Sequence, residues 1–141
     1  RRDVSLTIAG SNPSREVRTV CDAVEGVTLL ENPPDAGAVL QSADVLVNPT
    51  PWASGVNLKS IDMLSSGKPI VSTSMGVKGL PPEARRFFEI ADDPVRFAAL
   101  VARAADFTSD ASANVSAAQE FFGDIAAQSA LDEIDLFVRR K

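Results

Sequence analysis

The 141-residue sequence contains no histidine and a single cysteine, and these shortages limit its chemistry. Without histidine, the chain cannot supply a serine-histidine triad or a histidine metal site from its own residues. One cysteine cannot form an internal disulfide bond. Cys21 shares a helical stripe with Val17, Val20 and Val24, which favours core packing over a nucleophilic role. Long apolar runs are also missing, since none approaches the ~20 residues that span a bilayer. With nothing resembling a signal peptide, we expect a cytoplasmic domain.

Positive charge is in short supply as well. The chain has 14 Lys and Arg residues against 19 Asp and Glu residues, a net charge of −5. Nucleic-acid binding requires a basic stripe, so we expect no nucleic-acid partner. A single nucleotide is still allowed, because local dipoles and one or two cations decide the field at a small site. The basic end at residues 139–141 is interpreted as favourable charge at a helix C-terminus, or alternatively as contact with an anionic membrane surface.

Two familiar nucleotide-binding patterns are absent. Lys59 follows Leu58 where a Walker loop needs a glycine, and Pro69 follows Gly67-Lys68 where it needs serine or threonine. Gly10, after the first predicted strand, has no partner glycines for a dinucleotide fingerprint. We therefore expect no nicotinamide cofactor. The acids at Asp92-Asp93 precede a proline and are interpreted as a helix cap rather than a metal site.

Short apolar segments alternate with helical patterns along the chain. Strands are predicted at residues 4–9, 27–30, 45–47, 69–73 and 87–90. Helices are expected after Ser14, Asp35, Ser54 and Asp92-Asp93, followed by two more at 111–122 and 124–140. Connections this short imply parallel strands joined by right-handed crossovers. The prediction is a single α/β domain over residues 1–141. It has a doubly wound, Rossmann-like parallel sheet of about five strands, flanking helices and a C-terminal helical segment at 109–141.

The segment from residue 45 to residue 80 organises the predicted fold as a strand, a loop, a helix and a second strand. Ser54 is the expected N-cap, and Leu58, Ile61 and Leu64 recur at the spacing of a buried helix face. Ligands bind at the carboxyl ends of strands in such units. There, free N–H groups at a helix start carry about half a positive charge and suit a phosphate. We expect the N–H groups of residues 55–57 to face a nucleotide diphosphate.

Asp62 is the acidic residue of this predicted helix. Helical side chains lean toward the N-terminus, so its carboxylate would approach whatever the helix start holds and could accept two hydrogen bonds from ribose hydroxyls. The alternative is an i,i+3 ion pair with Lys59 on a solvated face. Spacing alone leaves both open. Trp52 is either a reporter of the pocket or, by slight preference, a core anchor.

Residues 54–80, SGVNLKSIDMLSSGKPIVSTSMGVKGL, resemble a known signature region. It belongs to the nucleotide-sugar half of GT-B glycosyltransferases of the retaining group 1 (family 4) type. The likeness includes the small-residue helix end before Lys68-Pro69, the following strand and the loop ending at Gly79-Leu80. It extends back to VSLTIAGSNP and LQSADVLVNPT, and so covers roughly residues 4–105.

The resemblance implies sugar transfer from a nucleotide sugar in carbohydrate biosynthesis, with retention at the anomeric carbon and without a metal or other cofactor. The family signature has a Glu for the donor sugar and a second Glu, eight positions later, for the ribose. Ser54 and Asp62 occupy these positions here. Asp62 would therefore bind the ribose, and Leu30 and Asn32 would meet the base. The residues implied for the donor sugar and diphosphate are Ser54, Gly55, Val56, Asn57, Leu58 and Lys59.

Parts of the family pattern are missing. An earlier strand and helix, which carry an Arg and a Lys for the diphosphate, do not precede Arg1, and neither does a separate acceptor-binding domain. We therefore expect a piece of a larger enzyme, inactive by itself. The missing N-terminal domain would hold an acceptor sugar or lipid-linked glycan, at the inner face of the membrane in one interpretation. No catalytic residue is identified. Because Ser54 lacks a charge, the alternatives are a non-catalytic Rossmann-like module or another GT-B enzyme, such as a sugar-nucleotide epimerase.

Overall fold

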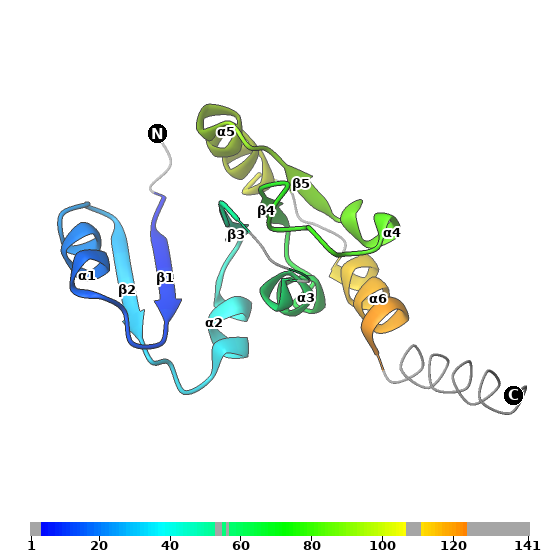
Figure 1. The fold of residues 1–141 in the computed structure, drawn as a ribbon, viewed down its shortest axis with the longest axis horizontal. Helices are drawn as coiled ribbons and strands as arrows, with labels where there is room; N and C mark the ends of the chain where they lie inside the picture. The colour runs from blue at the N-terminus through cyan, green and yellow to red at the C-terminus, as the bar shows by residue number, and fades with distance from the viewer. Residues whose placement is uncertain (1–3, 53–54, 56, 107–110, 124–141) are drawn as a thin grey trace, which may run out of the picture. The chain divides into compact units, whose positions relative to one another are not determined.

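The computed structural model describes residues 4–52, 55, 57–106 and 111–123. The chain forms two compact units, an N-terminal unit of residues 1–42 and a C-terminal unit of residues 43–141. The described residues include five strands, and every strand pair is parallel. The strands form a two-stranded sheet in the first unit and a three-stranded sheet in the second (Figure 1). The predicted α/β class, with parallel strands flanked by helices, is confirmed.

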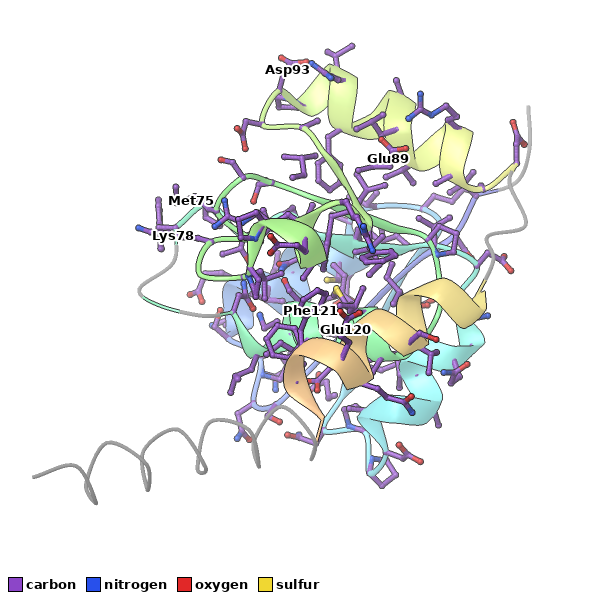
Figure 2. All side chains as sticks on the ribbon, turned by 90° about the vertical axis from the view of Figure 1, so that its right-hand side faces the viewer. Met75, Lys78, Glu89, Asp93, Glu120 and Phe121 are labelled. Atoms are coloured by element: carbon purple, nitrogen blue, oxygen red, sulfur yellow. The ribbon has the colours of Figure 1, made fainter. Side chains whose placement is uncertain are left out.

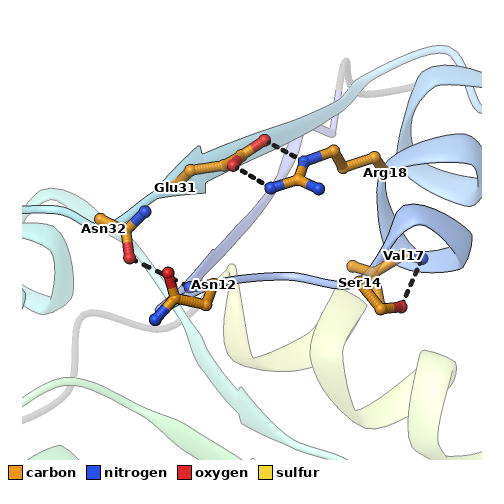
Figure 3. A network of polar contacts seen from close by, with 6 residues as sticks. All are labelled: Asn12, Ser14, Val17, Arg18, Glu31 and Asn32. Carbon is orange, nitrogen blue, oxygen red and sulfur yellow. Dashed lines mark hydrogen bonds and ion pairs between the residues drawn. The ribbon is translucent and has the colours of Figure 1, made fainter.

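The N-terminal unit has the element order β1 (Leu6–Gly10), α1 (Arg15–Asp22), β2 (Val27–Glu31) and α2 (Ala36–Ser42). Strands β1 and β2 pair in register from Leu6↔Val27 to Gly10↔Glu31. The predicted caps are confirmed: Ser14 Oγ accepts from the Val17 amide at 3.4 Å, drawn in Figure 3, and Asp35 Oδ1 accepts from the Ala38 amide at 3.0 Å.

Helix α1 buries less of its apolar stripe than the sequence predicts. Cys21 is buried, which confirms its packing role, but Val17, Val20 and Val24 are 40%, 64% and 50% exposed. The helix ends at Asp22, with Ala23 as its C-cap. The valines are exposed because α1 packs against β2 of a sheet with only two strands, which covers a narrow line of the helix surface rather than a full face.

The C-terminal unit contains the remaining described elements. In chain order they are β3 (Leu46–Asn48), α3 (Leu58–Ser65), β4 (Ile70–Ser72), α4 (Pro82–Arg85), β5 (Phe88–Ile90), α5 (Pro94–Ala104) and α6 (Ala111–Phe122). The strand order is β3-β4-β5, and the central strand β4 is buried along its whole length, as expected of a strand covered on both faces. Helix α5 covers β4, while α6 packs against α3 and α4 (Figure 1).

The core of this unit lies between β4 and α5. Val71 packs with Ala91, Leu100 and Ala104. Helix α5 begins as predicted, because Asp93 Oδ1 accepts from the Arg96 amide at 2.8 Å and Pro94 occupies the first turn. Among the helices of the described residues, none combines the length and apolar character needed to cross a bilayer. The helix predicted at 124–140 and the basic end at 139–141 lie outside the described residues.

Helix α3 begins later than the sequence predicts. Its first residue is Leu58 and its N-cap is Asn57, so the predicted start after Ser54 is wrong. Ser54 itself lies outside the described residues. The physical reason is at Gly55, whose φ of +88° is incompatible with a right-handed helix. The predicted buried face also changes: Leu64 is fully buried, but Leu58 is 71% exposed, and Ser60 is buried instead.

Candidate functional site

A cavity of about 560 Å³ opens at the carboxyl ends of the three strands in the C-terminal unit. This is the edge at which parallel α/β sheets bind ligands, and the volume is within the range of small-molecule sites. The lining residues follow β3, β4 and β5 and continue into α5: Pro49, Thr50, Pro51, Thr73, Ser74, Met75, Ala91, Asp92, Pro94, Phe97 and Ala98. Figure 2 shows Met75 on the loop that follows β4 and Asp93 at the start of α5.

Of the predicted donor residues, Ser54 and Val56 lie outside the described residues. Gly55, Asn57, Leu58 and Lys59 lie just before α3 or in its first turn, and none of these four lines the cavity. Helix geometry leaves the N–H groups of Leu58 and Lys59 without an acceptor inside the helix. Asp62 is exposed and stands four residues after Leu58, a rise of about 6 Å along the axis. Leu58, Lys59 and Asp62 therefore share an exposed helical face. Among the described residues, Asp62 forms no ion pair with Lys59, so the alternative pairing is not observed.

A chain of buried hydrogen bonds joins the end of β3 to α3 and to the loop after β4. Asn48, the last residue of β3, and Ser60 are 3% and 0% exposed. Asn48 Nδ2 donates to Ser60 Oγ at 3.0 Å, and the Ser60 hydroxyl donates to the Gly76 carbonyl at 2.6 Å. Buried polar groups are costly unless they are paired, and these pairs satisfy each other. The network therefore fixes how α3 sits on the sheet.

Thr50 extends this network toward the beginning of α3. Its hydroxyl donates to Asn48 Oδ1 and accepts from Asn57 Nδ2 at 3.5 Å. Its carbonyl accepts from Thr73 Oγ1 at 2.6 Å, and Thr73 Oγ1 in turn accepts from the Gly76 amide at 3.1 Å. The loops after β3 and β4 are thus tied together where both line the cavity.

Gly76 is required for this close approach. A Cβ atom at this position would clash with Ser72 Oγ and would lie 2.9 Å from Asn48 Nδ2 and 3.1 Å from the Asn48 carbonyl oxygen. Ser72 is itself fully buried, and its one hydroxyl proton is within reach of two carbonyl oxygens, that of Thr73 at 3.0 Å and that of Asn48 at 3.3 Å. Neither neighbour can move away without breaking a buried hydrogen bond.

The residues predicted to meet the base lie in the N-terminal unit, at the end of β2. Leu30 is 39% exposed. Asn32 has a φ of +49°, its amide donates to the Gly10 carbonyl at 2.9 Å, and its side-chain oxygen accepts from the Asn12 amide at 3.0 Å (Figure 3). Asn tolerates this left-handed conformation better than most residues. The side chain of Asn32 thus joins the loops that follow β1 and β2. The base contact stays a prediction.

Glu31, between these two residues, forms a bidentate ion pair with Arg18 of α1, with both N···O distances at 2.7 Å (Figure 3). The hydrogen bonds from the Arg18 guanidinium lower the pKa of the Glu31 carboxyl below its usual value, and those to Glu31 raise the pKa of Arg18. Glu31 is therefore ionised and hydrogen-bonded to Arg18, and this pair links α1 to β2 within the N-terminal unit.

Sequence reasoning missed Asn48, Ser60 and Gly76. Hydrophobic periodicity cannot identify a buried serine, because burial here depends on hydrogen bonds from other segments. One signal was available: an asparagine followed by proline ends a strand abruptly, and its side chain can bond to neighbouring backbone and hydroxyl groups. The preferred interpretation of Trp52 as a core anchor is also wrong, because the side chain is 80% exposed.

Within the described residues, no group of three or more Cys, Asp or Glu side chains is arranged to hold a metal ion.

Comparison with known proteins identifies relatives. A family model described as "Glycosyl transferases group 1" matches residues 1–107. A protein described as an uncharacterized 44.6 kDa protein in the cps region of Klebsiella pneumoniae is 31% identical over 103 residues. That alignment covers 68% of this chain and 26% of the relative, so the chain matches about a quarter of the relative's length.

Proposed function

Because the chain belongs to the group 1 glycosyl transferases, we propose that it binds a nucleoside-diphosphate sugar. Within a longer protein, it would supply the donor half of a sugar-transfer reaction. The family match over residues 1–107 is the observation that carries the proposal. The acceptor, a sugar or a lipid-linked glycan, would bind to a part of the enzyme outside these residues. This is consistent with a relative about four times as long as the region it shares with the chain.

The beginning of α3 is the proposed site for the diphosphate. The N–H groups of Leu58 and Lys59 point out of the first turn, where the helix dipole favours an anion. The Lys59 ammonium adds a cation on the same exposed face. Gly55, just before the helix, leaves open space around its Cα, since a Cβ there would meet no atom within 4 Å. Ser54 and Val56 complete the proposed segment.

Asp62 is the proposed ribose ligand. In the observed helix it stands about one turn from Leu58, and its side chain leans back toward the helix start. A carboxylate that faces two vicinal hydroxyls accepts two charge-assisted hydrogen bonds, which are the strong kind. A diphosphate bound at the amides would therefore bring the adjoining ribose within reach of this acid.

The proposed reaction is metal-independent transfer with retention of configuration. When the bond between the sugar and the diphosphate breaks, negative charge develops on the leaving phosphate. Preorganised N–H groups and the Lys59 ammonium would stabilise that charge in place of a metal ion. In the longer enzyme, transfer should continue in excess EDTA, and NMR of the product should show the anomeric configuration of the donor. Loss of activity in EDTA or an inverted product would contradict this mechanism.

Calorimetric titration of the 141-residue chain with UDP, GDP and ADP tests the donor site. We expect one of the three to bind, with the fluorescence of the exposed Trp52 changing in parallel because Trp52 shortly precedes the proposed diphosphate segment in the chain. If none binds at millimolar concentration, the proposal is wrong and a module without a donor site becomes the better description.

The Asp62→Ala variant tests the ribose contact. Loss of charge-assisted hydrogen bonds of about 1.5–3 kcal/mol should weaken binding by roughly tenfold to a hundredfold. Asp44→Ala is the matched control, because Asp44 is an exposed acid that precedes β3 at the opposite edge of the sheet. Equal affinity of the Asp62→Ala variant and the unmodified chain would exclude Asp62 as the ribose ligand.

The choice of base is proposed to depend on Leu30 and Asn32. The Asn32→Gly variant removes the side chain and keeps the left-handed backbone accessible. We expect the order of affinities for UDP, GDP and ADP to change in this variant. An unchanged order, with all three affinities preserved, would exclude a side-chain contribution of Asn32 to base selection.

A further inference from the structure

The N-cap residue of α3 does not cap its own helix. Asn57 has the extended backbone of an N-cap, with φ −86° and ψ 101°, yet its side chain makes no capping hydrogen bond. Asn is among the residues that cap most effectively, usually by accepting from an N–H group of the first turn. In this structure its carboxamide is turned instead toward Thr50, with Nδ2 at 3.5 Å from Thr50 Oγ1.

The direction of the hydrogen bonds explains why Thr50 can hold Asn57 in this way. The Thr50 hydroxyl gives its proton to Asn48 Oδ1, which leaves a lone pair of Oγ1 to accept from Asn57. Asn48 is in turn fixed, because its Nδ2 donates to Ser60 Oγ and the Ser60 proton goes to the Gly76 carbonyl. In each of these hydrogen bonds the donor lies on the side of Asn57 and the acceptor on the side of Gly76. The chain of hydrogen bonds therefore runs in one direction, from the N-cap of α3 to the loop after β4.

A second anchor restrains Thr50 itself. The Thr73 hydroxyl donates to the Thr50 carbonyl at 2.6 Å, and the Thr73 amide donates to the Asn48 carbonyl at 3.2 Å. The Thr50 backbone is thus tied to the loop after β4, and its hydroxyl to the end of β3. Asn57 meets a fixed acceptor rather than a mobile side chain.

We propose that Thr50 is a positioning residue that withholds the Asn57 side chain from capping α3. The first-turn N–H groups are thereby kept open for the phosphates of the donor. This inference rests on the proposed function, because it assumes that a nucleoside diphosphate binds at the start of α3. Without the Thr50 hydroxyl, the Asn57 carboxamide is released, caps its own helix and competes with the phosphate for the same N–H groups.

The Thr50→Val variant tests this by removing the hydroxyl and keeping the shape of the side chain. We expect the nucleoside diphosphate that binds the unmodified chain to bind this variant roughly fivefold more weakly, as competition with an Asn cap predicts. Thr50→Ser keeps the hydroxyl and should bind like the unmodified chain. Ser65→Ala is the matched control on the same helix, since Ser65 donates to the Ile61 carbonyl at the far end of α3.

A double variant separates positioning from a loss of structure. If competition by Asn57 weakens binding, Thr50→Val combined with Asn57→Gly should bind more tightly than Thr50→Val alone. A Thr50→Val chain that is merely damaged cannot regain affinity by losing a second side chain. Equal affinity of Thr50→Val and the unmodified chain, or no recovery in the double variant, would overturn the inference. If the unmodified chain binds no nucleoside diphosphate, the proposed function fails first and this inference fails with it.

Discussion

Replacing Gly76 with alanine provides a stringent test of the buried network. The added Cβ would clash with Ser72 Oγ and press against the side chain and carbonyl of Asn48. Overpacking of this kind costs typically about 1–3 kcal/mol. Relief requires Ser72 or Asn48 to shift, which breaks a buried hydrogen bond worth roughly 0.5–1.5 kcal/mol. We expect the free energy of unfolding to fall by about 2–4 kcal/mol in total.

Urea and thermal denaturation, followed by circular dichroism, measure this loss. At roughly 3–5 °C per kcal/mol, the midpoint temperature should fall by about 6–20 °C. Gly10→Ala is the control, because a Cβ at Gly10 meets no atom within 4 Å; its free energy of unfolding should change by less than about 0.5 kcal/mol. If Gly76→Ala unfolds at the same urea concentration as the unmodified chain, the tight contact between the loop after β4 and Asn48 does not exist.

Three further outcomes are expected. Leu64→Ala should lower the free energy of unfolding by about 2–5 kcal/mol in urea titrations, because Leu64 is fully buried, while Leu58→Ala should change it little because Leu58 is 71% exposed. Asp93→Ala should cost about 1 kcal/mol through loss of the α5 cap, which thermal denaturation can detect. Arg18 lowers the pKa of Glu31, so their pairing stabilises the fold above the ordinary glutamate pKa, roughly 4.3, and that stabilisation is lost as the pH falls through the lowered value. The difference in midpoint temperature between the unmodified chain and Arg18→Gln should therefore be present at pH 7 and should shrink as the pH falls below the ordinary glutamate value; a difference that stays constant through the acid range would contradict this assignment.

Much of the fold could be predicted from local patterns. The strands coincide with short apolar runs, and the caps predicted at Ser14, Asp35 and Asp92-Asp93 are observed, the last of them at Asp93. These features depend on residues that are close in sequence, so their chemistry is visible without the tertiary structure. The parallel pairing also follows from short strand-helix alternation, and it is observed in every strand pair.

The start of α3 could not be predicted because two cap candidates lie three residues apart. Ser54 and Asn57 are both good caps by residue type, and tertiary structure decides between them. The left-handed Gly55 prevents the helix from beginning earlier, and Thr50 engages the Asn57 side chain. Because the helix begins at Leu58, Asp62 stands about one turn after its first residue. The Leu58 and Lys59 amides therefore replace those of residues 55–57 as the proposed phosphate ligands, and the proposed ribose acid lies about one turn from them.

The buried face of α3 was mispredicted for a related reason. Periodicity selects apolar residues, so Leu58 was assigned to the core and Ser60 was not. In the structure, Ser60 is buried because Asn48 and the Gly76 carbonyl satisfy its hydroxyl. Such pairing involves residues 12 and 16 positions away, and no local rule reports it.

The N-terminal unit carries a built-in reporter of its own opening. Cys21, the chain's one thiol, is buried in that unit, so a maleimide or disulfide reagent can label it only when the unit opens. Trp52, the one indole, is already 80% exposed, and its emission cannot report unfolding in the same way. Labelling rates compared with circular dichroism on one sample would therefore distinguish opening of the N-terminal unit alone from unfolding of the whole chain without any engineered probe.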